Sequence, residues 1–238
     1  RALVQGHHDP LQGPCDGYTY AVLIDVGGAD ERAAAVIQEN SGRDSTALTV
    51  VEIDFSTLED QLIAKPSYRI VARRGWVNVP HRSLYGQLRG QIDHWRPAWV
   101  VIDATGVGEG LASFLATMMA PGRLLPFVFN SKTKSELGWS LLAMVETGRL
   151  KDHRHDGSAE QAEFWRQLEF VAYEARENQT LRWGVPDNLR DPATGELVHD
   201  DWVLSAALAG VLDDQPFGTA ESAVVPSTDP LLGLMEVY

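Results

Sequence analysis

One stretch restricts the possible folds of this chain more than any other: AWVVID, residues 98–103. It is a short, continuous apolar run, which is typical of a β-strand buried on both faces of a sheet. It leads directly into a glycine-rich turn and an apolar helical pattern, TGVGEGLASFLATMM, at 105–119. A buried strand followed by a turn and a helix is the repeating unit of layered α/β folds, so we expect a sheet covered by helices.

The remaining segments extend this pattern along the chain. Turn-bounded, β-rich runs predict further strands at 18–25, 45–54, 67–79, 124–130 and 179–186. Apolar residues at helical spacing predict further helices at 81–95, 134–148, 158–177 and 196–214. Three strands followed by alternating helices and strands predict an α/β fold, with a mixed central β-sheet and helices on both faces.

The two ends of the chain lack such periodicity. Residues 1–17 are rich in Gly, Pro and His and are expected to form a linker or irregular lead-in. Residues 213–238 are polar, acidic and contain proline, which predicts a flexible C-terminal tail. The folded domain is therefore expected to span residues 18–212. Because the chain begins at Arg1 rather than Met, we expect it to be a domain of a larger protein.

Composition excludes several classes of protein. No apolar run approaches the roughly 20 residues that span a bilayer, and Cys15 is the single cysteine, so one chain can form neither a disulfide nor a cysteine zinc site. The formal net charge of −13 argues against a nucleic-acid partner. However, ten acidic residues and a single basic one, Arg190, lie from Asp187 onward. The rest of the chain is close to charge balance, so DNA is not excluded.

Acidic residues stand at three ends of apolar elements. Asp25 and Asp103 each end a predicted strand, and Asp200 and Asp201 open the apolar helix of HDDWVLSAALAG. Strand ends and helix starts can converge at one edge of a mixed sheet, where clustered carboxylates would repel one another without a cation. Oxygen ligands suit Mg²⁺ or Mn²⁺. Two such ions, roughly 4 Å apart, would support phosphodiester hydrolysis.

Each of these acids also has a purely structural interpretation. An Asp after a strand commonly forms a turn or caps a helix, and an Asp at a helix start interacts favourably with the helix dipole. Capping needs only one acid, so the doubled acid at 200 and 201 is what this interpretation leaves unexplained.

The glycine-rich loops suggest a nucleotide-binding alternative. In TGVGEGL, Gly106, Gly108 and Gly110 are followed by Leu111 where a dinucleotide loop needs its third glycine. The chain contains no Walker A motif. The segment IDVGG resembles the phosphate loop of sugar kinases of the actin-like ATPase group, so an actin-like kinase or ATPase remains a competing hypothesis.

Four segments together resemble one family. YAVLIDVGG, VVIDATGVGEGLASFL, VFNSKTKSELGWSLLAMVETGRLK and HDDWVLSAALA follow in the order and spacing of the nuclease domain of tailed-bacteriophage large terminase subunits, the DNA-packaging motors. The resemblance covers about residues 18–212. It implies an RNase H-like fold, related to the RuvC-like superfamily, and metal-dependent endonuclease activity on double-stranded DNA. It also implies cleavage of concatemers in the cytoplasm of the infected bacterial host.

The resemblance also implies site residues and partners. Asp25, Asp103 and Asp201 would bind two Mg²⁺ or Mn²⁺ ions, with Asp200 as a fourth ligand, and His199 matches the family's histidine in a role that can equally be structural. Full-length large terminases also contain an ATPase domain with Walker motifs, which this sequence lacks, so we expect the nuclease domain alone. Expected partners are that ATPase domain, the small terminase subunit and the portal, with no membrane.

DNA contacts are expected from basic side chains that bind phosphates without reading bases. The main candidates are Lys132, Lys134, Arg73 and Arg74, and the secondary ones are Arg149 and Lys151. The turn-rich segment 187–198 is expected to form a hairpin that limits access to the site. A RuvC-like resolvase and a non-catalytic docking domain, with the acids as helix caps, remain alternatives.

Overall fold

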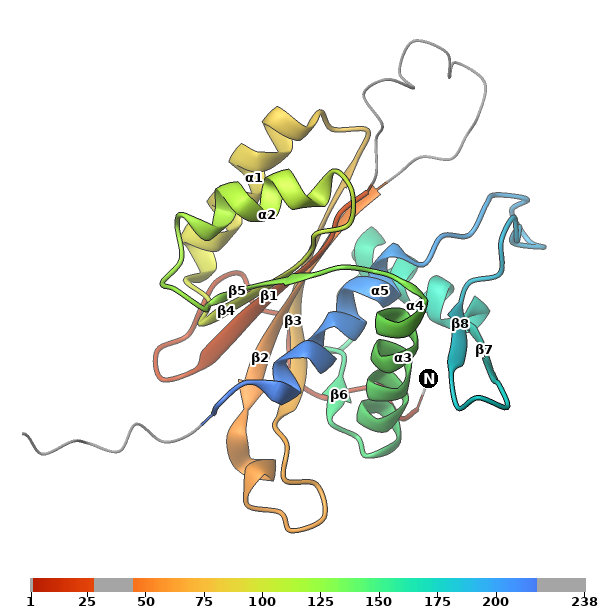
Figure 1. Ribbon diagram of the computed structural model, residues 1–238, viewed down its shortest axis with the longest axis horizontal. Helices are drawn as coiled ribbons and strands as arrows, with labels where there is room; N and C mark the ends of the chain where they lie inside the picture. The colour runs from red at the N-terminus through yellow and green to blue at the C-terminus, as the bar shows by residue number, and fades with distance from the viewer. Residues whose placement is uncertain (1, 28–44, 218–238) are drawn as a thin grey trace, which may run out of the picture.

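The computed structural model describes residues 2–27 and 45–217, which form one central sheet with helices on both faces (Figure 1). The sheet has six strands in the order β5-β4-β1-β2-β3-β6. Their bounds are β1 Thr19–Asp25, β2 Ser45–Asp54, β3 Ser67–Val77, β4 Trp99–Asp103, β5 Leu124–Phe127 and β6 Leu150–Lys151. The predicted α/β class and mixed sheet are confirmed.

The pairing within the sheet is both parallel and antiparallel. The β1, β2 and β3 strands pair antiparallel in sequence, and β4 then lies parallel to β1 on its other side. The β5 strand is parallel to β4, and the short β6 strand is parallel to β3. Strands β1 and β4 therefore end at the same edge of the sheet.

Helices form one layer on each face of the sheet (Figure 1). Helices α1 His81–Trp95 and α2 Gly108–Ala116 cover one face, and α3 Ser131–Glu146, α4 Ala159–Phe170 and α5 Asp201–Ala207 lie on the other. Alternation along β1 separates the two cores, because Val22 and Ile24 face α1 and α2 whereas Ala21 and Leu23 face the other layer. None of the helices in residues 2–27 and 45–217 is long and apolar enough to cross a membrane.

A small hairpin replaces part of a predicted helix. The pattern at 158–177 predicted a single helix, but α4 ends at Phe170 and residues 172–184 form strands β7 Ala172–Ala175 and β8 Leu181–Gly184. The hairpin is held by burial of Leu181 and Trp183 against α3. This tertiary packing outweighs the helical propensity of the sequence AYEARE.

The predicted helix at 196–214 is likewise divided. Its apolar centre forms α5, and the chain then tightens into the 3₁₀ helix η3, Leu208–Asp214; a second short 3₁₀ helix, η2, spans Phe55–Leu58. Residues 213–217 were expected to begin a flexible tail, but they pack against the domain. Asp213 accepts hydrogen bonds from Arg149 and Tyr68, and the ring of Phe217 contacts those of Phe55 and Trp99. The rest of the expected tail, 218–238, lies outside the described residues.

The N-terminal lead-in is irregular but is not a free linker. Val4 is buried, and its carbonyl accepts a hydrogen bond from the Asp152 amide at 2.7 Å. Farther along, the Leu11 amide donates to Val71 O, and the ring of His8 bonds Ile70 O at 2.7 Å. The segment therefore packs along β3 and the chain that follows β6, so the folded domain starts before residue 18.

Candidate functional site

The fold brings the four predicted acids to one edge of the sheet. Asp25 and Asp103 are the last residues of the parallel neighbours β1 and β4, where Ile24 lies in register with Ile102. Helix α5 packs against β1 and β2 and begins at Asp201, with Asp200 at its N-cap position. A third element joins at the start of β2, since the Ser45 hydroxyl donates a short hydrogen bond to the Asp201 carboxylate.

These carboxylates concentrate negative charge in one place, beside a single described lysine, Lys134. Asp25 is only 6% exposed, and burial raises its pKa well above the usual range. The charges of Asp201, Asp103 and Asp200 raise this pKa further, while nearby Lys134 lowers it. Burial also raises the pKa of Asp103, opposed by hydrogen bonds from Thr105. The four acids thus interact electrostatically and are not separate surface charges.

The doubled acid does not cap its helix. Asp200 occupies the N-cap position of α5, yet its side chain makes no capping hydrogen bond. The Trp202 amide donates instead to Oε1 of the buried Gln167, at 2.8 Å. The Gln167 amide group in turn donates to Glu163 at 3.1 Å. Because α4 supplies the cap, the carboxylate of Asp200 remains available for another role.

The structural interpretation holds in part for Asp103. Its Oδ1 accepts a hydrogen bond from the Thr105 amide at 2.8 Å, which stabilises the turn into α2. Gly108 completes this turn, because a Cβ at that position would lie 2.1 Å from Asp103 O. The glycine therefore permits close helix–strand packing. The competing IDVGG loop is only partly visible: the Gly27 amide donates to Thr46 Oγ1 at 3.2 Å, and Gly28 lies outside the described residues.

The donor set fits a hard divalent cation by its chemistry. All four side chains offer carboxylate oxygens, which are the ligands that Mg²⁺ and Mn²⁺ prefer. The pKa of Asp25 is raised by burial and then by the neighbouring carboxylates, whose negative charge a cation would neutralise. Within residues 2–27 and 45–217, no group of three or more His, Cys, Asp or Glu side chains could hold a metal ion as it stands. Binding would therefore require the carboxylates to rotate toward a shared ion.

The predicted DNA-binding lysines have different environments. Lys134, in the first turn of α3, lies 3.6 Å from Asp200 and 5.7 Å above the ring of Trp183, so it belongs to the acid site itself. Lys132 is exposed and its ammonium lies 3.8 Å from Glu136, one turn along the same helix.

The predictions for Arg73 and Arg149 were wrong. Arg73 is 5% exposed and its guanidinium lies 2.8 Å from Asp152 and 4.2 Å from the centre of the Phe164 ring, so no DNA phosphate can reach it. Alternation along β3 turned this side chain into the core. Arg149 is also buried and donates to Asp213. Arg74 is exposed, and Lys151 donates to the carbonyl of Leu3.

The segment before the acidic pair folds back on itself. The Val198 amide donates to Leu189 O, and the Asp191 amide donates to Glu196 O, both at 2.9 Å. The buried Asp191 lies 3.5 Å from Arg166 on α4, which ties this loop to the helix that caps α5. His199 follows the loop and is half-buried. The hairpin expected at 187–198 is thus present; whether it limits access stays a prediction.

Three further residues at the site were missed by sequence reasoning. Ser45 contacts Asp201, Gln167 caps α5, and Gly184 allows close approach at the end of β8, where a Cβ would lie 2.7 Å from Asp200 Oδ2. Ser45 and Gln167 lie far from Asp200 and Asp201 in sequence. Gly184 comes to lie beside Asp200 only when hairpin β7–β8 forms. No local motif in the sequence marks these positions.

Comparison with known proteins identifies the fold. No protein-family model and no curated protein match the chain. Among solved structures, the large terminase nuclease domain of Thermus phage P74-26 superposes with a TM-score of 0.57 at 15% identity, over 91% of this chain and 95% of that one. The large terminase nuclease of thermophilic phage G20c with bound magnesium gives 0.56 at 16% identity, over 88% and 93%.

A third solved structure agrees. The nuclease domain of the large terminase subunit gp2 of bacterial virus Sf6, with manganese and beta-thujaplicinol, gives a TM-score of 0.51 at 7% identity, over 81% and 87% of the two chains. The resemblance read from the sequence is therefore confirmed at the level of the fold: this chain has the RNase H-like α/β fold of phage large terminase nuclease domains.

Proposed function

We propose that the chain is the metal-dependent endonuclease domain of a phage DNA-packaging terminase and cuts double-stranded, concatemeric DNA. One observation carries this proposal: Asp25, Asp103, Asp200 and Asp201 converge at one edge of the sheet, where the pKa of Asp25 is raised by burial and by the charges of the other three. Such a cluster costs stability unless a cation binds. The terminase nuclease fold makes phosphodiester hydrolysis the chemistry that best accounts for it.

The four carboxylates would hold the metal in the proposed mechanism. Asp25, the most buried of them, would bind two Mg²⁺ or Mn²⁺ ions together with Asp103, Asp201 and Asp200. When bound, such ions activate a water for attack on phosphorus and stabilise the leaving 3′ oxygen. The structures with bound magnesium and manganese belong to the G20c and Sf6 proteins, and we extend the binding of a divalent metal to this chain.

Surrounding residues would keep the acids in place. The Ser45 hydroxyl fixes one oxygen of Asp201, and the ammonium of Lys134 offsets the charge of Asp200. Gln167 accepts the hydrogen bond from the first turn of α5, so neither acid is needed as the helix cap. These contacts hold the acids close to one another, which a two-ion site needs.

The biological setting follows from the same proposal. The domain would act in the cytoplasm of the infected bacterial host on double-stranded DNA, together with the terminase ATPase domain, the small terminase subunit and the portal. Arg74, Lys132 and Lys134 are the predicted phosphate contacts that the structure leaves accessible or part-exposed.

Plasmid cleavage tests the proposal directly. With Mg²⁺ or Mn²⁺, the wild-type chain should nick or linearise supercoiled DNA, and Asp25→Ala and Asp201→Ala should each reduce the rate at least about 100-fold. Asp93→Asn, at an exposed position of α1 over the opposite face of the sheet, is the control and should cleave normally. Undiminished cleavage by both site variants would overturn the assignment.

The alternatives predict different substrates. A RuvC-like resolvase would use the same acids but prefer a four-way junction over linear duplex, which a competition assay measures. An actin-like kinase or ATPase predicts ATP binding, and a docking domain predicts that Mn²⁺ does not bind; calorimetry with each ligand separates them. The missing capping bond at Asp200 argues against the docking hypothesis.

A further inference from the structure

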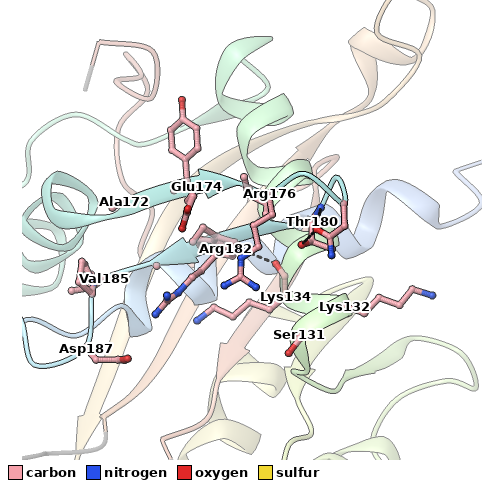
Figure 2. A pocket seen from close by; sticks show the side chains of 16 residues that line it. Ser131, Lys132, Lys134, Ala172, Glu174, Arg176, Thr180, Arg182, Val185 and Asp187 are labelled. Atoms are coloured by element: carbon pink, nitrogen blue, oxygen red, sulfur yellow. Dashed lines mark hydrogen bonds between the residues drawn. The ribbon is translucent and has the colours of Figure 1, made fainter.

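A groove of about 780 Å³ lies between the start of α3 and hairpin β7–β8 (Figure 2). Its floor and walls come from Ser131, Lys132 and Lys134 on α3 and from both strands of the hairpin. The hairpin stands away from the main sheet, since all four residues of β7 are exposed. The groove is therefore a surface feature between two elements that the central sheet does not join directly.

Four basic side chains line this groove in a chain whose formal net charge is −13. They are Lys132, Lys134, Arg176 and Arg182. Figure 2 shows Lys134 and Arg182 extending into the groove, whereas Lys132 points away from them. No carboxylate in the described part of the chain forms an ion pair with Arg176 or Arg182, although Glu174 lies opposite Arg182 in the hairpin register. Two charged groups thus remain available to a ligand.

The hairpin is held rigidly against α3. The Trp183 indole N–H donates to Lys134 O at 2.5 Å, and the Leu181 amide donates to Ser135 Oγ at 2.8 Å. Trp183 packs so closely on Gly138 that a Cβ there would lie 2.3 Å from the indole. Leu181 and Trp183 are buried against α3, whereas Arg182 between them is exposed and lines the groove.

The groove leads directly to the acid cluster. Gly184 ends β8 with φ of 128°, and a Cβ on it would lie 2.7 Å from Asp200 Oδ2 and 3.4 Å from Lys134 Nζ. Lys134 itself both lines the groove and lies 3.6 Å from Asp200. A ligand that contacts Arg182 and Lys134 is thereby brought to the proposed catalytic carboxylates.

We propose that this groove binds the sugar–phosphate backbone of the DNA strand and guides it to the acid cluster, with Arg176 and Arg182 as positioning residues. This inference rests on the proposed nuclease function and adds the element that holds its substrate. Long, flexible cations spaced along an open groove suit repeated phosphates and carry no base-specific pattern. Lys134, at the junction, would contact the phosphate nearest the acids.

The test measures DNA binding separately from cleavage. Fluorescence anisotropy with a labelled duplex in EDTA compares the wild-type chain with Arg176→Gln/Arg182→Gln. Each lost phosphate contact should weaken binding roughly tenfold at 0.1 M salt and reduce the slope of log K against log salt by about 0.9. The matched control is Arg82→Gln/Arg89→Gln, which removes the same charge from exposed positions on α1.

The outcomes distinguish the groove from general electrostatics and from the nuclease assignment. Equal weakening in both double variants would mean that net charge alone governs binding, and unchanged binding in the groove variant would mean that the hairpin does not contact DNA. Either result overturns the proposal.

Cleavage in Mg²⁺ tests the positioning role. The groove variant Arg176→Gln/Arg182→Gln should have a higher KM and an unchanged kcat, because saturating DNA restores occupancy. A fall in kcat alone would contradict a positioning role. Retained cleavage by Asp25→Ala would instead overturn the nuclease function and leave the binding result standing.

Discussion

At the scale of single residues, the acidic pair shows how the site avoids a conflict. An Asp at a helix start normally binds the free amides of the first turn. Here Gln167 takes that role, Ser45 holds Asp201 and Lys134 lies beside Asp200. The two acids are therefore held by different neighbours and are not equivalent. From the sequence alone, two adjacent acids are more than helix capping requires. The sequence did not indicate that Gln167 supplies the cap in their place.

Gly184 should be required for the position of Asp200. In Gly184→Ala, the new Cβ would lie 2.7 Å from Asp200 Oδ2, so the carboxylate must move and cleavage should fall about tenfold or more. Strain at positive φ should also cost roughly 1 kcal/mol of stability. Gly157→Ala is the control, because Gly157 has φ of 76° with open space around it. It should lose similar stability, measured by urea unfolding, while cleaving normally. If Gly184→Ala and Gly157→Ala lost equal activity, backbone strain and not displacement of Asp200 would be responsible.

At the scale of elements, the sequence predicted what is encoded locally. The helix at 81–95 and the strand at 45–54 have the expected bounds, because apolar periodicity and turn residues lie within each segment. The ends of β1 and β4 were also predictable, and with them the meeting of Asp25 and Asp103. Strand β8 lies within the predicted strand at 179–186, but its partner β7 was not predictable, since AYEARE favours a helix by propensity and pairs with β8, whose Trp183 packs on Gly138 of α3. Arg73 was also misjudged: alternation along β3 places it in the core, but Asp152, the partner that pairs with the buried charge, is distant in sequence.

Gln167 should be needed for activity more than for stability. Gln167→Met keeps the size of the side chain but leaves the Trp202 amide without its acceptor, which should cost about 1–2 kcal/mol and loosen the first turn of α5. Cleavage should then fall about tenfold in kcat, since both acids lie in or beside that turn. Ser158→Ala removes the cap of α4 and is the matched control. Ser158→Ala should lower the Tm about as much as Gln167→Met and leave kcat unchanged. If Ser158→Ala lowers kcat as much as Gln167→Met does, the loss of the Gln167 cap does not act through the position of the acids.

At the scale of the whole molecule, the N-terminal lead-in makes folding sensitive to pH. Burial lowers the pKa of His8, an effect only partly offset by its hydrogen bond to Ile70 O. The unfolded chain therefore takes up the proton first as the pH falls below about 6.5, and this contribution to stability is lost from there down to the lower folded-state pKa. His8→Gln keeps a donor for Ile70 O but cannot titrate. Its Tm should fall less than that of the wild type between pH 7.5 and 5.5, and parallel curves would contradict the prediction.

The acid cluster should make the stability of the whole domain depend on a divalent cation. Buried like charges destabilise the folded chain without metal, so in EDTA the Asp25→Asn variant should be more stable than the wild type, on the order of 1–3 kcal/mol. A cation that binds the folded state should reverse this order, since binding at 100 times Kd contributes about 2.7 kcal/mol. The Tm of the wild type should thus rise with Mg²⁺ or Mn²⁺, while Asp25→Asn and Asp201→Asn respond weakly and Asp93→Asn behaves as wild type. Asp93 lies on α1, whereas the acids lie at the edge of the sheet. Equal Tm shifts in the wild type and all three variants would therefore mean that the cation binds elsewhere.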